Sequence, residues 1–384
     1  MATPSRAGGA VAPATVSPAT AAEVAEELAA GGRVRPVGGG TKLAWGAPGA
    51  APDRELSTGR LDRIVAHNEG DLTAVLQAGV PLARAQAAFA LHGQRLTLDP
   101  PDGGGRATIG GILAAGDSGP LRHRFGGPRD LILGVRVALP DGTVARAGSD
   151  VIKNVAGYDL AKLQCGALGT LGVICEATVR LHPLAEATVT VRARGTDPAT
   201  LAAAARTLAR HPLELESLDL RWDGPIDGGC LLARAVGRTV ESSVRTLIGL
   251  ARAAGLETDT IDDDDQLWAE QRDRQRALPD AAVVRVSALP ADLDRVMRAS
   301  PSAVGRPALG LFWVRIDADP DALGALRGAL APAPCVLLDA PAELRAAVDP
   351  WGIGPGTELE LLRRVKQSFD PAGICNSGRY AGGL

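Results

Sequence analysis

The pattern of apolar and polar residues changes near residue 183 and divides the chain into two parts. In the first part, short strands and helices alternate with glycine-rich loops. A capping box at Thr20 and Glu23 predicts an initial helix that ends at Gly31 and Gly32. We expect further helices over 82–91 and 160–163, and strands over 33–37, 64–67, 72–78, 95–98, 132–139, 144–147 and 173–181.

The second part, from about residue 187 to 340, predicts strands that alternate with longer helices. Such alternation is typical of an antiparallel sheet with its helices on one face. A last helix over 358–369 stops before Pro371, and a glycine-rich tail follows that suits a segment folding back over the first part. We expect strands over 188–194, 218–222, 230–236, 282–286 and 309–316, and helices over 198–209, 240–254, 266–276, 291–299 and 321–330.

Composition narrows the class of protein. A hydrophobic content of 46% and a charged content of 22% are ordinary for a globular protein, and a net charge of −3 gives no basic surface for nucleic acid. Five widely spaced cysteines without a CxxC pair argue against an iron–sulfur cluster and suit a reduced, cytosolic protein. Residues 1–19 lack the features of a signal peptide and are expected to be a disordered tail.

Three glycine clusters carry the candidate chemistry. The first is RPVGGGTK at 35–42, the second lies within 99–139, and the third is GALGTLGVIC at 166–175. Glycines beside a strand leave backbone N–H groups free to hold anionic oxygens, although each cluster alone could be a tight turn. Neither the P-loop pattern nor the GxGxxG dinucleotide pattern fits the first cluster.

Four motifs in series resemble those of the vanillyl-alcohol oxidase flavoproteins, which carry a PCMH-type FAD-binding domain. They are RPVGGGTK, the TIGG to PDG segment, KNVAGYDLAKLQCGALGTLGVI and FDPAGICNSGR. The resemblance implies an α+β fold: a two-part PCMH-type domain over 20–183, then a smaller ferredoxin-like domain with an antiparallel sheet over 187–345. Residues 346–384 would form a helix and a tail that return to the FAD-binding domain.

The same resemblance implies a non-covalent FAD and assigns its contacts. It also implies catalytic roles for Arg124 and Tyr158. Arg124 and Phe125 match an Arg-Tyr pair of the related 2-hydroxy acid dehydrogenases, so the tyrosine hydroxyl is missing here. The implied FAD contacts are Pro36, Val37, Gly38, Gly39, Gly40, Thr41, Lys42, Pro101, Asp102, Thr108, Ile109, Gly110, Gly111, Gly119, Val173, Ile174, Asn376 and Arg379.

No metal is predicted. The dehydrogenases of this family hold a metal with histidines and a glutamate of their C-terminal half, whereas the only histidines after residue 123 here are His182 and His211, both beside prolines. His123 lies within the central glycine-rich segment, and we interpret it as an exposed loop histidine that does not bind flavin covalently.

Within the family, the chain is most similar to the FAD-binding subunits of bacterial glycolate oxidases. This implies a related larger flavoprotein subunit and an iron–sulfur subunit as partners, with glycolate or another 2-hydroxy acid as substrate. It also implies a cytoplasmic location, with contact to the inner membrane face only through partners. Direct oxidation by this chain, electron relay from the related subunit, a stand-alone alcohol oxidoreductase and a scaffold with a degenerate flavin site all stay open.

Overall fold

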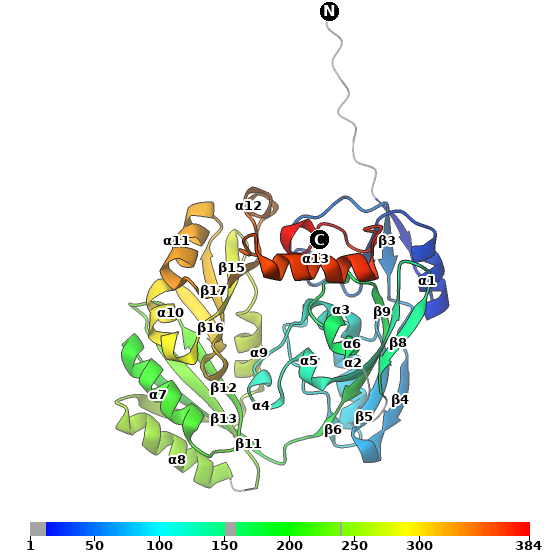
Figure 1. Cartoon of the computed structure of the whole chain (residues 1–384). Helices are drawn as coiled ribbons and strands as arrows, with labels where there is room; N and C mark the ends of the chain where they lie inside the picture. Colours follow the sequence, from blue (N-terminus) through cyan, green and yellow to red (C-terminus); the bar gives the residue numbers. More distant parts are fainter. Residues whose placement is uncertain (1–12, 150–158, 239) are drawn as a thin grey trace, which may run out of the picture.

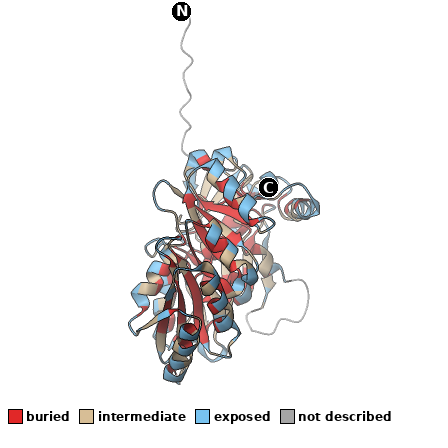
Figure 2. Ribbon diagram, turned by 90° about the vertical axis from the view of Figure 1, so that its left-hand side faces the viewer, coloured by how far each residue is buried: buried red, intermediate tan, exposed pale blue. Residues whose placement is uncertain are grey.

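The computed structural model describes residues 13–149, 159–238 and 240–384. It has the predicted α+β architecture, with two domains side by side and a C-terminal helix, α13 (Thr357–Phe369), that lies along the first domain (Figure 1). Buried positions concentrate in the strands, while the outer helices carry the exposed ones (Figure 2). Within the described part of the chain, every helix is too short or too polar to cross a membrane.

The first domain is built from two sheets. A five-stranded antiparallel sheet has the order β4 (Ile64–Asn68), β5 (Thr73–Gln77), β9 (Val173–Arg180), β7 (Ile132–Ala138) and β8 (Val144–Gly148). A three-stranded parallel sheet joins β1 (Ala14–Val16), β3 (Arg54–Ser57) and β2 (Val34–Val37). The helices and short strands are α1 (Ala21–Ala29), α2 (Leu82–Ala90), β6 (Gln94–Arg95), α3 (Ile109–Ala115), α4 (Arg122–Phe125), α5 (Pro128–Leu131), α6 (Leu160–Gln164) and β10 (His182–Pro183).

Two features of this domain correct the sequence analysis. The tail expected over 1–19 is shorter, because residues 14–16 form β1 and pair in parallel with β3, a strand that was not predicted. The TIGG segment, expected as a loop, opens α3 instead. Its glycine at position 110 packs against β5: a Cβ there would lie 2.6 Å from the Cβ of Ala78.

The second domain is one antiparallel sheet of eight strands. The order is β14 (Glu257–Ile261), β11 (Thr188–Gly195), β13 (Gly229–Val236), β12 (Leu215–Trp222), β16 (Ser302–Arg306), β17 (Leu311–Asp317), β15 (Ala281–Ser287) and β18 (Cys335–Asp339). The helices α7 (Pro198–Arg210), α8 (Val240–Ala253), α10 (Leu293–Ala299) and α11 (Pro320–Leu330) cover its outer face and form the main core with it (Figure 1). Shorter helices are α9 (Asp265–Asp273) and α12 (Ala342–Ala347).

Three strands of this sheet were not predicted, for different reasons. The edge strand β14 reads ETDTI and has no apolar face of its own, β16 is short and interrupted by Gly305, and β18 is buried throughout, so it shows no alternation. The strand expected over 309–316 begins at Leu311, because Gly310 (φ +65°) forms a turn too close to the carbonyl of Ala288 for any side chain.

The other face of the large sheet packs on the first domain. Trp45 and Ala115 of the first domain share an apolar cluster with Val283, Val304, Trp313, Val336 and Leu338 of the second. The Trp45 indole N–H donates to the buried Asp339 carboxylate at 2.8 Å. The loop after the first glycine cluster therefore connects a glycine-rich site in one domain to the sheet of the other.

Candidate flavin site

A narrow cavity of about 80 Å³ lies where β2, α3 and the C-terminal tail meet; we call it the cradle. The tail reaches it because Asn376 N donates to Val34 O at 2.8 Å and Val34 N donates to Ile374 O at 2.8 Å. Ten of the predicted FAD contacts line the cradle, although they come from three distant parts of the sequence: Pro36, Gly38, Gly39, Gly40, Thr41, Lys42, Thr108, Gly111, Asn376 and Arg379.

At two glycines of the cradle, the backbone lies very close to neighbouring atoms. A Cβ on Gly38 would lie 2.3 Å from Thr108 Oγ1, and a Cβ on Gly39 would lie 1.6 Å from the carbonyl oxygen of Arg106. Only glycine fits at either position. The Thr108 hydroxyl is itself buried and has no hydrogen-bond partner within the described residues. A buried hydroxyl beside an opening of this size fits a phosphate oxygen as its missing partner.

The charge of the cradle also fits a pyrophosphate. Lys42 is compensated, since its Nζ lies 3.2 Å from the buried Asp117 carboxylate and donates to the carbonyl of Pro101. Arg379 is bound to carbonyl oxygens only, among them Trp45 O at 2.7 Å, and forms no ion pair in the described part of the chain. Burial lowers the pKa of Arg379 to about 10, which still leaves it positive at neutral pH. The cradle thus has one uncompensated positive charge.

The remaining predicted contacts do not line the cradle but belong to the core and loops around it. Ile109, Val173 and Ile174 are core residues. Val37, Pro101 and Asp102 each present a backbone carbonyl to the surrounding loops, accepting from Thr58, Lys42 and Ala107 respectively. Gly110 touches Ala78, and Gly119 lies against the carbonyl of Asp99. Direct contact of these eight residues with FAD stays a prediction.

A second cavity of about 480 Å³ lies between the domains and shares Ala115 and Leu168 with the cradle. Arg122 and Arg129 reach it from the first domain, and Arg285 reaches it from β15. The Arg285 guanidinium has no hydrogen-bond or ion-pair partner among the described residues, and burial lowers its pKa. We call this space the interdomain cavity; its least compensated group is a cation.

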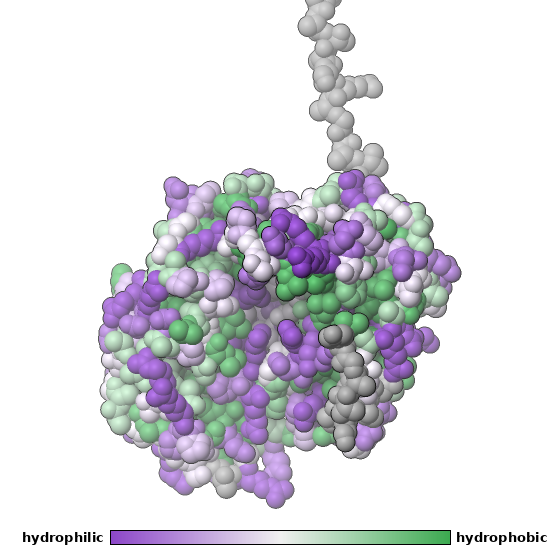
Figure 3. Space-filling view, viewed as in Figure 1, coloured by the Kyte–Doolittle hydropathy of each residue, from purple (hydrophilic) through white to green (hydrophobic). Residues whose placement is uncertain are grey.

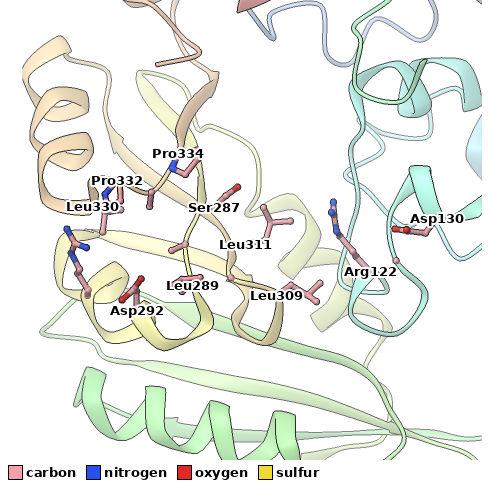
Figure 4. A pocket seen from close by; sticks show the side chains of 15 residues that line it. Arg122, Asp130, Ser287, Leu289, Asp292, Leu309, Leu311, Leu330, Pro332 and Pro334 are labelled. Atoms are coloured by element: carbon pink, nitrogen blue, oxygen red, sulfur yellow. The ribbon is translucent and has the colours of Figure 1, made fainter. Parts of the chain in front are cut away.

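The interdomain cavity continues outward into a groove of about 650 Å³, with which it shares Arg122, Asp130, Ser287 and Leu311. Figure 4 shows Arg122 and Asp130 on one side of the groove, facing side chains of the second domain on the other. In the space-filling view the molecule is hollowed between the two domains, below α13 (Figure 3). Cradle, interdomain cavity and groove therefore adjoin one another in this order, and we call the series the flavin path.

The predicted catalytic residues are not brought together. Arg124 projects from α4 over the ring of Phe125 and lies 3.9 Å from Glu214, outside the lining of these three spaces. Tyr158 lies outside the described residues. The arginine of α4 that lines the path is Arg122. His123 is not an exposed loop residue: it belongs to α4, is partly buried, and burial lowers its pKa.

Sequence reasoning missed Arg285 and Arg122. A usable signal existed for Arg285, which is the only charged residue of the strand AAVVRVS. A charge within an otherwise buried strand is uncommon unless it is paired or functional. Arg122 gave no such signal, because RHRF offers two arginines and only the helix geometry decides which of them faces the cavity.

Comparisons with known proteins agree with this site. A family model described as an FAD binding domain matches residues 12–148. Glycolate oxidase subunit GlcE of Escherichia coli is 30% identical over 329 residues, which cover 82% of this chain and 84% of that protein. D-lactate dehydrogenase of Archaeoglobus fulgidus is 36% identical over 146 residues, covering 38% of this chain and 32% of that protein.

A solved structure of alkyldihydroxyacetonephosphate synthase has the same fold, with a TM-score of 0.71 at 16% identity over 94% of this chain and 76% of that one. A chitooligosaccharide oxidase aligns with a TM-score of 0.63 at 14% identity, over 94% of this chain and 89% of that one. The cofactor is FAD, and the reaction class is oxidation of CH–OH donors. The chain belongs to the family of FAD-dependent oxidoreductases that includes glycolate oxidase subunit GlcE.

Proposed function

We propose that this chain is the FAD-binding subunit of a multi-subunit 2-hydroxy acid dehydrogenase that oxidises glycolate to glyoxylate. In this role it takes electrons from a related, larger flavoprotein subunit and passes them to an iron–sulfur subunit. FAD, when bound, supplies the electron-accepting chemistry. The chain's own residues bind it, shield it and leave one route to it open. Contact with the membrane, if the complex makes any, would be through the partners.

The observation that carries the proposal is that the surface groove adjoins the interdomain cavity, with which it shares four lining residues. The cradle residues Gly38, Gly39 and Thr108 fit the pyrophosphate, and the interdomain cavity adjoins the cradle at Ala115 and Leu168. A flavin ring held in that cavity would lie at the inner end of a groove of about 650 Å³. Such a groove is larger than a small hydroxy acid requires, and it gives a redox partner access.

The groups that line the interdomain cavity favour relay over direct oxidation. Direct oxidation of an alcohol needs a general base within hydrogen-bond reach of the hydroxyl. Among the described lining residues the only carboxylate is Asp130, which already accepts from Gly127 N at 2.8 Å and caps α5. The Cys165 thiol is a poor base because burial raises its pKa to about 12.

The test is reduction of an artificial dye by glycolate, with the purified FAD-loaded chain alone and with its two partners. We expect the chain to hold one FAD and to reduce dye only when the larger flavoprotein subunit is present. D-lactate serves as a second substrate in both arms. Full turnover by the chain alone would overturn the relay role and leave the flavoenzyme assignment intact.

One observation favours a second candidate, direct oxidation of a hydroxy acid by this chain. The unpaired Arg285 guanidinium in the interdomain cavity would suit a substrate carboxylate. In the relay role, the same cation would instead compensate negative charge on the reduced cofactor. If Arg285→Met raises KM for glycolate in the isolated chain, direct oxidation is correct; if the isolated chain shows no turnover with either residue, relay is correct.

A further inference from the structure

A cluster of two histidines and one glutamate lies at the outer edge of the first domain, away from the flavin path. His67 is on the edge strand β4, Glu69 is in the turn that follows, and His92 comes just after α2. Figure 1 shows β4 on the side of this domain that faces away from the second domain. We propose that these three side chains bind a divalent cation, with Zn²⁺ as the best match.

The ligand atoms are already close. One atom from each residue can be chosen so that all three lie within 4.8 Å of one another, and His92 Nδ1 is 2.9 Å from Glu69 Oε1. The two imidazole rings are perpendicular, with centroids 5.0 Å apart. Zinc–nitrogen bonds of about 2.0–2.1 Å in a tetrahedron place neighbouring ligand atoms about 3.3 Å apart. Small rotations of partly or fully exposed side chains close the difference.

A neighbouring glutamine prepares His67 for metal binding. Gln94 Nε2 donates to the carbonyl of Glu69 at 2.9 Å, which fixes the amide so that its Oε1 faces His67 Nε2, also at 2.9 Å. Because an amide oxygen only accepts, His67 Nε2 must carry the ring proton. This leaves Nδ1 as the ring nitrogen that can offer a lone pair to a metal ion.

The two histidines of the cluster are also held in place by the domain core. The His67 ring packs edge-on against the fully buried Phe89 of α2, with centroids 4.9 Å apart. His92 N donates to Phe89 O at 3.0 Å, so both histidines are positioned by the same core residue. Gln94 is itself buried. A bound ion would have three protein ligands and a fourth position open to solvent, and it would join β4 to the end of α2.

This site differs from the histidines weighed in the sequence analysis. The expectation of no metal rested on His182 and His211, and neither belongs to the cluster of His67, Glu69 and His92. His182 instead bonds to Thr97 Oγ1, and burial lowers its pKa to about 4. The proposal does not depend on the function of the flavin site.

The experiment titrates Zn²⁺ alone into the full FAD-loaded chain, previously treated with a chelator, in competition with a chromophoric chelator. We expect one ion per chain, and loss of this binding in His67→Gln and in His92→Gln. Gln94→Leu should weaken binding about 10-fold or more, because it removes the group that fixes the tautomer. His211→Gln, in the other domain, is the matched control and should bind as the parent does.

X-ray absorption of the zinc-loaded chain should report two imidazole ligands and oxygen. Flavin absorbance and the circular dichroism spectrum confirm that each variant is folded, which is expected because His92 is exposed and His67 and His211 are only partly buried. Binding that persists undiminished in the His67→Gln, His92→Gln double variant, or no stoichiometric binding by the parent chain, would overturn the proposal.

Discussion

The two walls of the flavin path use different chemistry. The cradle of the first domain is made of backbone: Gly38 and Gly39 approach their neighbours too closely for any side chain. The opposing wall of the interdomain cavity is made of side chains from a sheet, with Arg285 as an unpaired cation. The cradle therefore depends on positions without side chains, whereas the charge of the opposing wall comes from Arg285.

This difference decides what each wall tolerates. A backbone cradle depends on close packing and fails when volume is added. A partly buried cation without an ion-pair partner costs stability, so replacing Arg285 should stabilise the fold and weaken the binding of an anionic group in the cavity. The two walls should therefore respond to substitution in opposite ways, and the following changes test this.

The largest effect is expected from Gly39→Val. The new side chain would meet the carbonyl of Arg106 at the closest approach of any glycine in the described structure, so the cradle cannot close and FAD binding should be lost. The measurement is FAD released from the purified protein. Gly70→Val is the control, because a Cβ at Gly70 meets nothing within 4 Å and should leave FAD content unchanged.

Thr108→Val separates binding from folding if Gly39→Val does not fold. It removes only the unpartnered hydroxyl, and the loss of one hydrogen bond to a charged group should weaken FAD binding by about 10-fold or more. Unchanged affinity in this variant would contradict the assignment of the cradle to the pyrophosphate.

Lys366→Met should have the next largest effect, because this residue holds the tail against the cradle. Its Nζ donates to the buried Asp370 at 2.6 Å, to Thr170 O and to Cys375 O. Breaking a buried pair leaves a buried carboxylate uncompensated and should lower the free energy of unfolding by about 3–5 kcal/mol. Denaturant unfolding measures this change.

The control is Lys162→Met, which removes an exposed pair with Asp159 and should cost less than about 1 kcal/mol. Equal destabilisation by the two variants would mean that burial of the Lys366 pair does not matter. FAD affinity should fall only in Lys366→Met, since the displaced tail includes Asn376.

Arg285→Met and Arg306→Met should change thermal stability in opposite directions. Arg285 is unpaired, so its replacement relieves a desolvation cost and should raise Tm by a few degrees. Arg306 is almost fully buried, donates to Gln275 at 2.8 Å and lies 3.7 Å from the buried Asp219. Its replacement leaves Asp219 uncompensated and should lower Tm. A lower Tm in both variants would contradict the description of Arg285 as a cation without a partner.

A further effect is a pH dependence at Asp99, which lines a separate cavity between the domains together with Arg272 of α9. Desolvation raises its pKa to about 7, above the value of about 3.9 in an unfolded chain. Between about pH 4 and 7 the folded chain holds a proton that the unfolded chain has released, so this group's contribution to stability falls as pH rises. Asp99→Asn removes the dependence. Its Tm relative to the parent should rise from pH 4 to 7, and a flat difference would contradict the raised pKa.

The contrast between the walls also explains what the sequence could predict. The three glycine clusters are local patterns, and ten residues assigned through them meet in one cradle. Helices with clear apolar periodicity, such as α13, were predicted within a residue of their ends. The expectation of a loop at TIGG was wrong because Gly110 serves helix–strand packing, which depends on where Ala78 lies in space.

The side-chain wall could not be predicted in the same way. Whether Arg285 has a partner depends on strands β17 and β18, which flank β15 but are distant in sequence, and β18 itself was not predicted. The groove forms only where α4 faces the second domain, so Arg122 is distinguished from Arg124 by tertiary structure alone. No local sequence pattern shows which charged side chains will face the other domain.

The most direct test of the proposed role is the absorbance of the bound flavin after anaerobic addition of glycolate, with and without the larger flavoprotein subunit. We expect the flavin of the isolated chain to stay oxidised, and to bleach only once that subunit is added. Bleaching of the isolated chain at the same rate would contradict this expectation and would make this chain the site of substrate oxidation.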